Sequence, residues 1–415
     1  MELLKVDTIE EAMSKLMAYG QHLPLNKEKV GLYQMMGRIL AEDIVSRESV
    51  PSFPRSTVDG YAVRSKDTGG AGESIPAFLQ VIGEVEMGKS ADLMVGPGQC
   101  VYVPTGGMVP AGADAMVMVE YCEGFGQQMA IYSSVSEGNN MVLAGDDMKE
   151  GELILKKGRK LRAADLGVLA ALGRTEVDVY QPWKVSILST GDEIVSPEQK
   201  PDPGQVRDVN SYGLYGQAVE YGFQVPVCRV VEDDESLLRE AVASAMETSD
   251  VVVISGGSSQ GKKDATARIV DDLTSSGVFT HGIAIKPGKP TILGFDEGSK
   301  TAVIGLPGHP VAAMLLFQLL VGGLWKQVTE LEQREANTRI RGIMASNVAA
   351  SPGRRTYQLV TIQKAEGEGF PKIVPIRGTS GLIRTMSEAD GYIILDVNDE
   401  GISRGEMATA YLWEK

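Results

Sequence analysis

A chain of 415 residues is too long for one hydrophobic core, and its length predicts two to four domains. Charged residues make up 23% and hydrophobic residues 43%, a globular composition that excludes a disordered, collagen-like or membrane-embedded chain. With 40 Lys and Arg against 55 Asp and Glu, the net charge is −15, which argues against nucleic acid or an anionic membrane surface as a partner. A small anionic ligand therefore needs a local cluster of cations and backbone N–H groups.

Three scattered cysteines, with no CxxC pair and only three histidines beside them, argue against a zinc site and a disulfide framework. We therefore expect a reducing, cytoplasmic environment. The N-terminus lacks a basic segment followed by an apolar run, so no secretory signal is expected. The longest apolar stretch, 311–325, is shorter than the roughly 20 residues that span a bilayer, and it predicts a buried helix.

The N-terminal half reads as two kinds of structure. Thr8 and Glu11 form a capping-box pair, and apolar residues at helical spacing then run to Gly20, which predicts an amphipathic helix. Residues 46–140 are rich in Gly, Pro and short alternating segments, which predicts an inserted β-rich module. The flanking segments 1–45 and 141–178 then predict a small helical or mixed linking domain.

The C-terminal half begins with the region whose strand and helix patterns are clearest. Residues 179–328 alternate apolar strands such as KVSILST and DVVVIS with helical segments, which predicts a central three-layer α/β domain with a mostly parallel sheet. Ligands of such sheets bind beyond the carboxyl ends of the strands. Residues 329–415 alternate polar and apolar positions and predict a C-terminal β domain, so the whole chain is an α/β multidomain protein.

The segment SGGSSQGKKD follows an apolar strand and precedes a helical stretch. Its small residues let a ligand approach the backbone, and hydroxyls with N–H groups favour an anion; these residues are Ser255, Gly256, Gly257 and Ser258, followed by Asp264. A plain Gly-rich turn is the alternative. The segment matches neither GxGxxG nor GxxxxGK[ST], so the common dinucleotide and P-loop interpretations do not apply.

Adjacent carboxylates follow another apolar strand in STGDEIV. Asp192 and Glu193 point in different directions, so one can bind Mg²⁺ while the other meets a hydroxyl or ring N–H; the alternative is an acidic helix start. Asp233 and Asp234 are either close to a metal or a solvated helix cap. Asn210 is interpreted as the cap of the helix that follows it.

In AIKPGKP, Lys286 and Lys289 flank a Pro-Gly turn at Gly288. Two cations held by a rigid turn beside a Gly-rich loop favour phosphate or oxyanion binding over a purely solvated role.

Three further turns contribute candidates. Pro307 and Gly308 in GLPGHP aim backbone N–H groups from a helix start, where His309 is interpreted as a cap or packing residue rather than a general base. Asp59 in STVDGYAVR and Thr105 in PTGGMVPAGADAMVMVE each occupy a Gly-framed turn, with an ordinary turn as the alternative.

These segments, in this order, resemble the molybdopterin molybdenumtransferases of molybdenum cofactor biosynthesis, a family that includes the carboxy-terminal part of gephyrin. The resemblance covers nearly the whole chain and rests on STVDGYAVR, PTGGMVPAGADAMVMVE, STGDEI, SGGSSQGKKD, AIKPGKP and GLPGHP. It implies an elongated, four-part homodimer whose central domain is similar to molybdopterin adenylyltransferase and whose linking domain dimerises. The chain departs from the family pattern in FPRSTVDG, GSSQG and GHP, and it has Gly282 where a Lys is common.

The resemblance also implies an activity. Molybdate enters the dithiolene of adenylylated molybdopterin with release of AMP and with Mg²⁺ as cofactor. Asp59, Glu193, Asp233 and Asp264 are then the catalytic carboxylates, with Asp59, Glu193 and Asp264 as metal ligands. The remaining positions bind the cofactor: Thr105, Asp192, Ser255, Gly256, Gly257, Ser258, Lys286, Gly288, Lys289, Pro307, Gly308, Arg354 and Ser380.

Two other functions remain open from the sequence. The first alternative is a scaffold protein of the gephyrin type, and the second is a nucleotide-processing relative that shares the central domain. The DGYAVR module argues against the latter. Molybdopterin adenylyltransferase and recipient molybdoenzymes are the expected transient protein partners.

Overall fold

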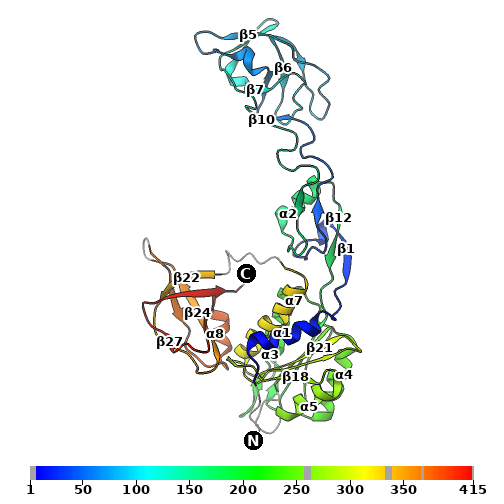
Figure 1. Ribbon diagram of the computed structural model, residues 1–415, viewed down its shortest axis with the longest axis vertical. Helices are drawn as coiled ribbons and strands as arrows, with labels where there is room; N and C mark the ends of the chain where they lie inside the picture. The colour runs from blue at the N-terminus through cyan, green and yellow to red at the C-terminus, as the bar shows by residue number, and fades with distance from the viewer. Residues whose placement is uncertain (1–5, 257–262, 332–338, 366–368, 414–415) are drawn as a thin grey trace.

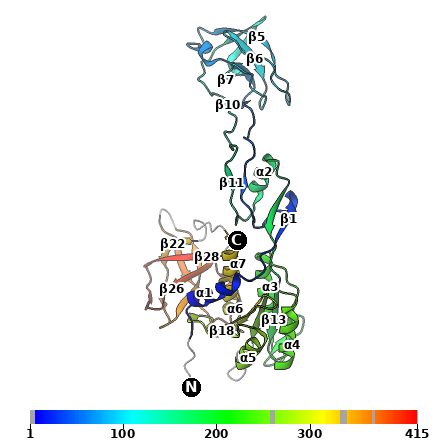
Figure 2. The same ribbon diagram turned by 45° about the vertical axis from the view of Figure 1, so that its right-hand side comes forward.

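The computed structural model describes residues 6–256, 263–331, 339–365 and 369–413, without the side chains of residues 263 and 264. The molecule is elongated (Figure 1). A β module lies at one end, a slender stalk joins it to the body, and the body holds the central and C-terminal domains side by side (Figure 2). The ends of the molecule therefore carry different parts of the predicted site.

The distal β module is a six-stranded sheet in the order β7-β4-β6-β5-β9-β8. Its strands are β4 (Gly60–Val63), β5 (Ala77–Glu84), β6 (Gln99–Val103), β7 (Ala115–Met118), β8 (Cys122–Phe125) and β9 (Gln128–Ile131). Both faces of the sheet carry apolar clusters, because successive side chains of a strand point to opposite faces: Val101 packs with Met116, and its neighbour Cys100 packs with Leu79. The module thus has its own core.

The stalk consists of chain segments that run out to the module and back. It pairs β1 (Lys27–Gly31) with β12 (Glu176–Tyr180), β2 (Ile44–Val45) with β11 (Leu153–Leu155), and β3 (Arg55–Ser56) with β10 (Met141–Val142), all antiparallel. Helix α2 (Ala163–Ala171) packs its buried Leu169 into a small cluster with Met35, Leu40 and Leu161. The segments that flank the inserted module therefore lie together.

Helix α1 (Ile9–Gly20) begins with the expected capping box. Glu11 N donates to Thr8 Oγ1 (3.1 Å), and Thr8 N donates to Glu11 Oε2 (2.8 Å). The sequence grouped α1 with the linking domain, but α1 packs on the central domain, and Leu23, Ile39 and Ala41 of the same segment join that core cluster. Leu16 is fully buried there, and the Tyr19 ring stacks on Phe279 at 4.8 Å. An amphipathic helix packs wherever its apolar face finds a matching surface, and the sequence does not specify that surface.

The central domain is built on a six-stranded sheet in the order β16-β13-β17-β21-β20-β18. Its strands are β13 (Val185–Thr190), β16 (Cys228–Val231), β17 (Val251–Gly256), β18 (Val278–His281), β20 (Ile292–Asp296) and β21 (Thr301–Leu306). The first four strands are parallel as expected, but β20 runs antiparallel to both of its neighbours, β21 and β18, so the sheet is mixed. Only four residues join β20 to β21, and so short a connection permits only an antiparallel pair.

Helices contact the sheet of the central domain on both sides. They are α3 (Asn210–Glu220), α4 (Glu235–Met246), α5 (Lys263–Leu273), α6 (Pro310–Phe317) and α7 (Gly323–Val328), with a π-helical turn η4 (Gln318–Gly322) between the last two. Val253 packs with residues of α6 and α7, whereas its neighbour Val252 packs with residues of α4 and α5. The carboxyl edge of the parallel strands is therefore framed by helices.

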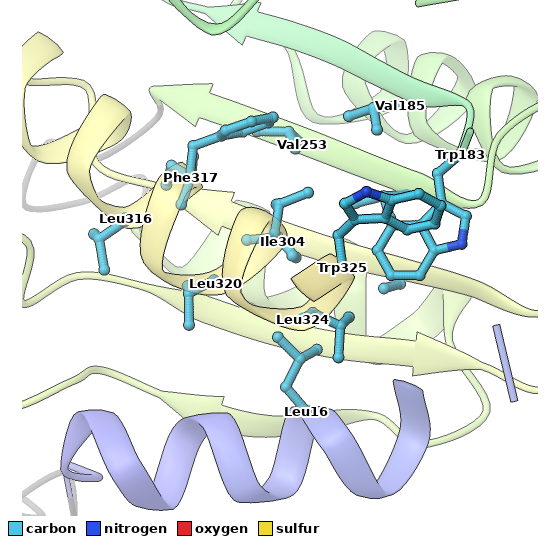
Figure 3. Packing of buried hydrophobic residues seen from close by; sticks show 14 of the residues in the cluster. Leu16, Trp183, Val185, Val253, Ile304, Leu316, Phe317, Leu320, Leu324 and Trp325 are labelled. Atoms are coloured by element: carbon cyan, nitrogen blue, oxygen red, sulfur yellow. The ribbon is translucent and has the colours of Figure 1, made fainter. Parts of the chain in front are cut away.

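The apolar stretch expected as a buried helix forms α6, η4 and α7. This continuous helix, Pro310–Val328, is apolar and long enough to span a membrane by composition, but most of it is buried inside the protein. Its residues Phe317, Leu320 and Leu324 lie in one cluster between the sheet and α1, and Trp325 meets Trp183 at 4.8 Å between ring centroids (Figure 3). The helix thus anchors the central core.

The C-terminal domain is a closed β structure. Its strands are β22 (Arg339–Met344), β24 (Arg355–Gln363), β25 (Lys372–Pro375), β26 (Gly391–Leu395) and β28 (Met407–Leu412), and they pair in a ring because β24 also pairs with β26. A short helix α8 (Ile383–Glu388) follows β25 and contacts α6. The two-residue strand β19 (Ile285–Lys286) of the central domain adds to β24, and this pairing joins the two domains.

Candidate functional site

The carboxyl ends of the four parallel strands meet at one edge of the central sheet. Thr190 at the end of β13 is in register with Val231 of β16 and Gly256 of β17, and Ser255 is in register with Leu306 of β21. Each strand is followed directly by one of the motifs predicted from the sequence. The fold therefore collects at one edge four segments that lie far apart along the chain.

Carboxylates gather on one side of this edge. The backbone N–H of Asp233 donates to Asp192 Oδ1 at 3.3 Å, which joins the loops after β13 and β16. Asp192 and Glu193 are exposed and Asp233 is half-buried. Asp234 caps α4 through the N–H groups of Ser236 and Leu237, so the cap predicted for this pair falls on Asp234 and leaves Asp233 at the edge.

A buried asparagine ties the edge together, and the sequence interpretation of this residue as a helix cap is wrong. Asp208 Oδ1 instead accepts the N–H of Ser211 at the start of α3. Asn210 Nδ2 donates to both Ser255 Oγ and Gly308 O, each at 2.8 Å. The Asn210 amide therefore bonds to residues at two strand ends rather than to its own helix, and no local pattern predicts these contacts.

Two buried polar atoms at this edge have no hydrogen-bond partner among the residues that the structure describes. Asn210 Oδ1 and Thr190 Oγ1 both lie below the surface without a hydrogen bond. Buried polar atoms are nearly always satisfied, by protein, water or ligand, so a polar partner outside the described residues is expected here. The sequence predicts neither unsatisfied atom, because Thr190 ends an apolar strand and Asn210 was interpreted as a helix cap.

The Gly-rich loop begins at Gly256. This residue has φ +116°, and a Cβ there would collide with the Thr190 carbonyl oxygen, so only glycine fits. Gly257 and Ser258 lie outside the described residues, as does the side chain of Asp264 near the start of α5. What the structure describes is the entrance to the loop, with Ser255 buried behind it.

Three cationic side chains lie on segments that border the junction with the C-terminal domain. Ile285 and Lys286 of β19 are in register with Arg355 and Thr356 of β24, and Arg355 N donates to Ala284 O at 3.0 Å. The exposed Lys286 thus lies one strand away from the segment that carries Arg354. The turn after it has Gly288 at φ +122°, and Lys289 is again exposed. Lys286, Lys289 and Arg354 therefore border the same domain boundary.

A second junction lies at the start of α6. His309 Nδ1 and Ser380 Oγ are 2.8 Å apart, and Val311 N donates to Ser380 O at 3.1 Å. Ser380 belongs to the loop between β25 and α8, so the C-terminal domain reaches the strand edge here. His309 occupies the N-cap position, but its side chain makes no capping bond. Its ring instead contacts Ser380, a pairing of residues 71 positions apart that the sequence did not predict.

The distal module holds the remaining candidates. Asp59 Oδ1 accepts the N–H of Thr105 at 2.8 Å, and both residues are exposed. They lie at the far end of the molecule from the central sheet (Figure 1). Within one chain, the structure therefore brings these two residues together but does not bring them to the strand edge.

The site lacks two chemical groups that other enzymes use. All three cysteines are free, and burial raises the pKa of the Cys100 and Cys122 thiols to about 12, so neither supplies a thiolate near neutral pH. Within the described ranges, no group of three or more His, Cys, Asp or Glu side chains is placed to hold a metal. The resolved chemistry of the edge is thus hydrogen bonding and charge.

A groove of about 250 Å³ lies at the opposite edge of the sheet, where the parallel strands begin. Trp183, Lys184, Gln224 and Asp250 line it, and burial is the main cause that raises the pKa of the Asp250 carboxyl. None of the residues singled out from the sequence lines this groove.

Comparison with known proteins covers nearly the whole chain. Residues 7–173 match the MoeA N-terminal region (domain I and II), 186–327 match a molybdopterin binding domain, and 341–413 match the MoeA C-terminal region (domain IV). The molybdopterin molybdenumtransferase of Haemophilus influenzae is 31% identical over 404 residues, which cover 97% of each chain. The Staphylococcus aureus protein of that name is 31% identical and covers 98% of this chain and 95% of its own.

Solved structures give the same picture. The molybdopterin biosynthesis MoeA protein from Pyrococcus horikoshii OT3 has a TM-score of 0.82 with 30% identity. The alignment covers 99% of this chain and 100% of that one.

Proposed function

Because this chain belongs to the MoeA family of molybdenum cofactor biosynthesis and is a molybdopterin molybdenumtransferase, we propose that it inserts molybdate into the dithiolene of adenylylated molybdopterin and releases AMP. The observation that supports this reaction is that two separate junctions hold the C-terminal domain against the central one: Lys286 pairs with β24, and His309 contacts Ser380. A phosphorylated substrate and an oxyanion can then be bound beside each other.

The substrate itself supplies the reactive sulfur atoms. Each Mo–S bond that forms displaces an oxygen from molybdate, and that oxygen leaves as water once protonated. A water molecule cleaves the phosphoanhydride, so AMP leaves and the phosphate stays on the pterin. The protein therefore needs no nucleophile of its own, which agrees with the raised thiol pKa values of Cys100 and Cys122.

The protein contributes charge and alignment. Lys286, Lys289 and Arg354 offset the negative charge of phosphate and molybdate, and Ser380 offers a hydroxyl to the oxyanion. At the strand edge, the backbone around Gly256 and Gly308 presents N–H groups to the adenylate, and Pro307 fixes the turn, with Ser255, Asp192, Glu193 and Asp233 around them. The local cations act against a net charge of −15 over the whole chain.

Mg²⁺ is the cofactor expected for this reaction, and hard carboxylate oxygens are its preferred ligands. Among the described side chains, the donors of one chain do not fit a magnesium site, because Asp59 lies in the distal module and Glu193 at the strand edge, while the side chain of Asp264 is outside the described residues. Within the described part, no carboxylate cluster is placed for a metal. We therefore derive no step through the ion.

A homodimer would let the distal module of one chain reach the strand edge of the other. Helix α3 supports an interface, because Tyr212, Tyr215 and Val219 lie at helical spacing and are 58%, 46% and 51% exposed. In such a dimer, Asp59 and Thr105 of a second copy complete the site. The central domain would keep a three-layer arrangement similar to molybdopterin adenylyltransferase, and the enzyme would work in the cytoplasm.

Sedimentation tests the dimer. Tyr215→Glu places a charge on the apolar face of α3 and is expected to shift the protein towards a monomer, whereas Tyr121→Glu in the distal module, at a similar 49% exposure, leaves the dimer intact. A wild-type protein that sediments as a monomer at micromolar concentration contradicts the proposed interface.

The reaction is tested with purified protein, adenylylated molybdopterin, Mg²⁺ and molybdate. AMP release and activation of an apo-molybdoenzyme are measured. Lys286→Ala is expected to slow AMP release about 10- to 150-fold, since a charged hydrogen bond contributes about 1.5–3 kcal/mol. Lys149→Ala, at an exposed lysine of the stalk region, is expected to have no effect. Equal rates in the Lys286→Ala variant and wild type, or no activation by wild type, would refute the proposal.

A further inference from the structure

His309 introduces a titratable ring into the junction between the domains. It is exposed, precedes Pro310 at the start of α6, and lies with Nδ1 2.8 Å from Ser380 Oγ. The main chain of Ser380 is held independently by the N–H of Val311. The ring therefore acts on the Ser380 hydroxyl without being needed to hold the loop.

The charge of the ring decides what the hydroxyl can do. A hydroxyl has one proton, and a neutral imidazole that accepts at Nδ1 takes that proton, so Ser380 presents only lone pairs to an anion. A protonated imidazole donates from Nδ1 to Oγ, which frees the hydroxyl proton for the anion and adds a positive charge beside it. The neutral tautomer with Nδ1–H frees the proton but adds no charge.

Besides Lys286, Lys289 and Arg354 at the domain junction and Glu220 at the end of α3, few charged groups among the described residues lie around α6. On α8, Arg384 Nε and Glu388 Oε1 pair with each other at 2.6 Å. Arg377 lies in the same loop as Ser380, three residues before it. Asp208 lies just before α3 and accepts the N–H of Ser211 in the first turn of that helix. Strand β21 and α6 themselves carry no charged side chain. A proton on His309 therefore changes the local charge directly.

We propose that His309 and Ser380 form a proton-linked switch for a tetrahedral oxyanion, so that the anion binds with uptake of one proton at His309. The proposal rests on the proposed function, because it takes molybdate as the anion. His309 is a positioning residue here, since it acts through the Ser380 hydroxyl. By linkage, affinity falls up to about tenfold per pH unit on the alkaline side of the His309 titration and levels off on the acid side.

Equilibrium dialysis of molybdate against the full-length protein between about pH 6 and pH 8 tests the switch, because histidine changes charge in this range. Molybdate stays a dianion there. Wild type is expected to bind more weakly as pH rises. His309→Asn keeps an amide that donates at every pH, so it binds with a flat pH profile, and Ser380→Ala binds weakly with a flat profile. His281→Asn, at the end of β18, retains the wild-type slope.

Nuclear magnetic resonance gives a readout that a purely structural role would not move. The chain has only three histidines, so the His309 ring signal is assigned by its loss in the His309→Asn variant. Molybdate is expected to move the titration of that signal to higher pH and to leave those of His22 and His281 in place.

The outcomes separate the two proposals. Molybdate binding with the same slope in His309→Asn as in wild type overturns the switch and leaves the proposed function standing. Absence of molybdate binding in wild type at every pH, while the protein is folded, overturns the site assignment and the switch together.

Discussion

Replacing Asn210 by Ala removes the side chain that joins the start of α3 to two strand ends at the site. Its Nδ2 donates to Ser255 Oγ and Gly308 O, each at 2.8 Å, and only 8% of the residue is exposed. The Ser255 hydroxyl can turn towards Pro307 O, 3.5 Å away, but the Gly308 carbonyl loses its side-chain donor. Two hydrogen bonds at about 1 kcal/mol each, plus one unsatisfied acceptor, give a loss of about 2–4 kcal/mol.

Urea unfolding followed by tryptophan fluorescence measures this loss. Trp183 and Trp325 both lie in the central core and report on that domain. With a denaturant slope of about 2 kcal/mol per molar, the midpoint of the central-domain transition is expected about 1–2 M lower than in wild type. AMP release should fall as well, because the Gly308 backbone shifts.

The matched control is Asn347→Ala. Asn347 accepts a single hydrogen bond from the N–H of Arg404 in an exposed turn of the C-terminal domain, so its loss leaves the central transition unchanged. An Asn210→Ala midpoint equal to wild type would show that the buried amide contributes no net stability, and the argument from its two acceptors would fail.

Two further predictions concern the same core and the cysteines. Gly256→Ala is expected to destabilise the central domain by about 2 kcal/mol or more, because its φ is positive and the new Cβ collides with the Thr190 carbonyl. Gly204→Ala, also at positive φ but in open space, is expected to cost about 1 kcal/mol. Equal urea midpoints for the two variants would contradict the collision. The pKa values of the Cys100 and Cys122 thiols are raised to about 12, so both thiols stay protonated up to strongly alkaline pH. After brief treatment of the native protein with iodoacetamide at about pH 8, mass spectrometry should find both cysteines unmodified. Rapid alkylation of either one would contradict this prediction.

The sequence predicted the parts of the fold that local patterns determine. The capping box of α1, the buried helix Pro310–Val328 and the alternation of strands and helices in the central domain all follow from spacing and polarity, and the structure confirms them. The motifs of the central domain directly follow predicted strands, which was enough to predict that they meet at the carboxyl edge of the sheet, because parallel strands share a direction.

Contacts between distant segments could not be predicted in the same way. The packing of α1 on the central domain, the bond between His309 and Ser380, and the bridge from Asn210 to Gly308 each join residues with no common local pattern. The mixed sheet also depends on one tight connection, after Asp296, rather than on strand composition. The separation of Asp59 from the strand edge is a property of the stalk, whose length no single motif encodes.

Strand β19 belongs to the chain of one domain and to the sheet of the next. Lys286 is therefore carried by the ladder that begins at Arg355, and a tilt of the C-terminal domain relative to the central one moves both cationic segments in the same direction. Such a tilt keeps the spacing between Lys286 and Arg355, because one ladder holds both residues.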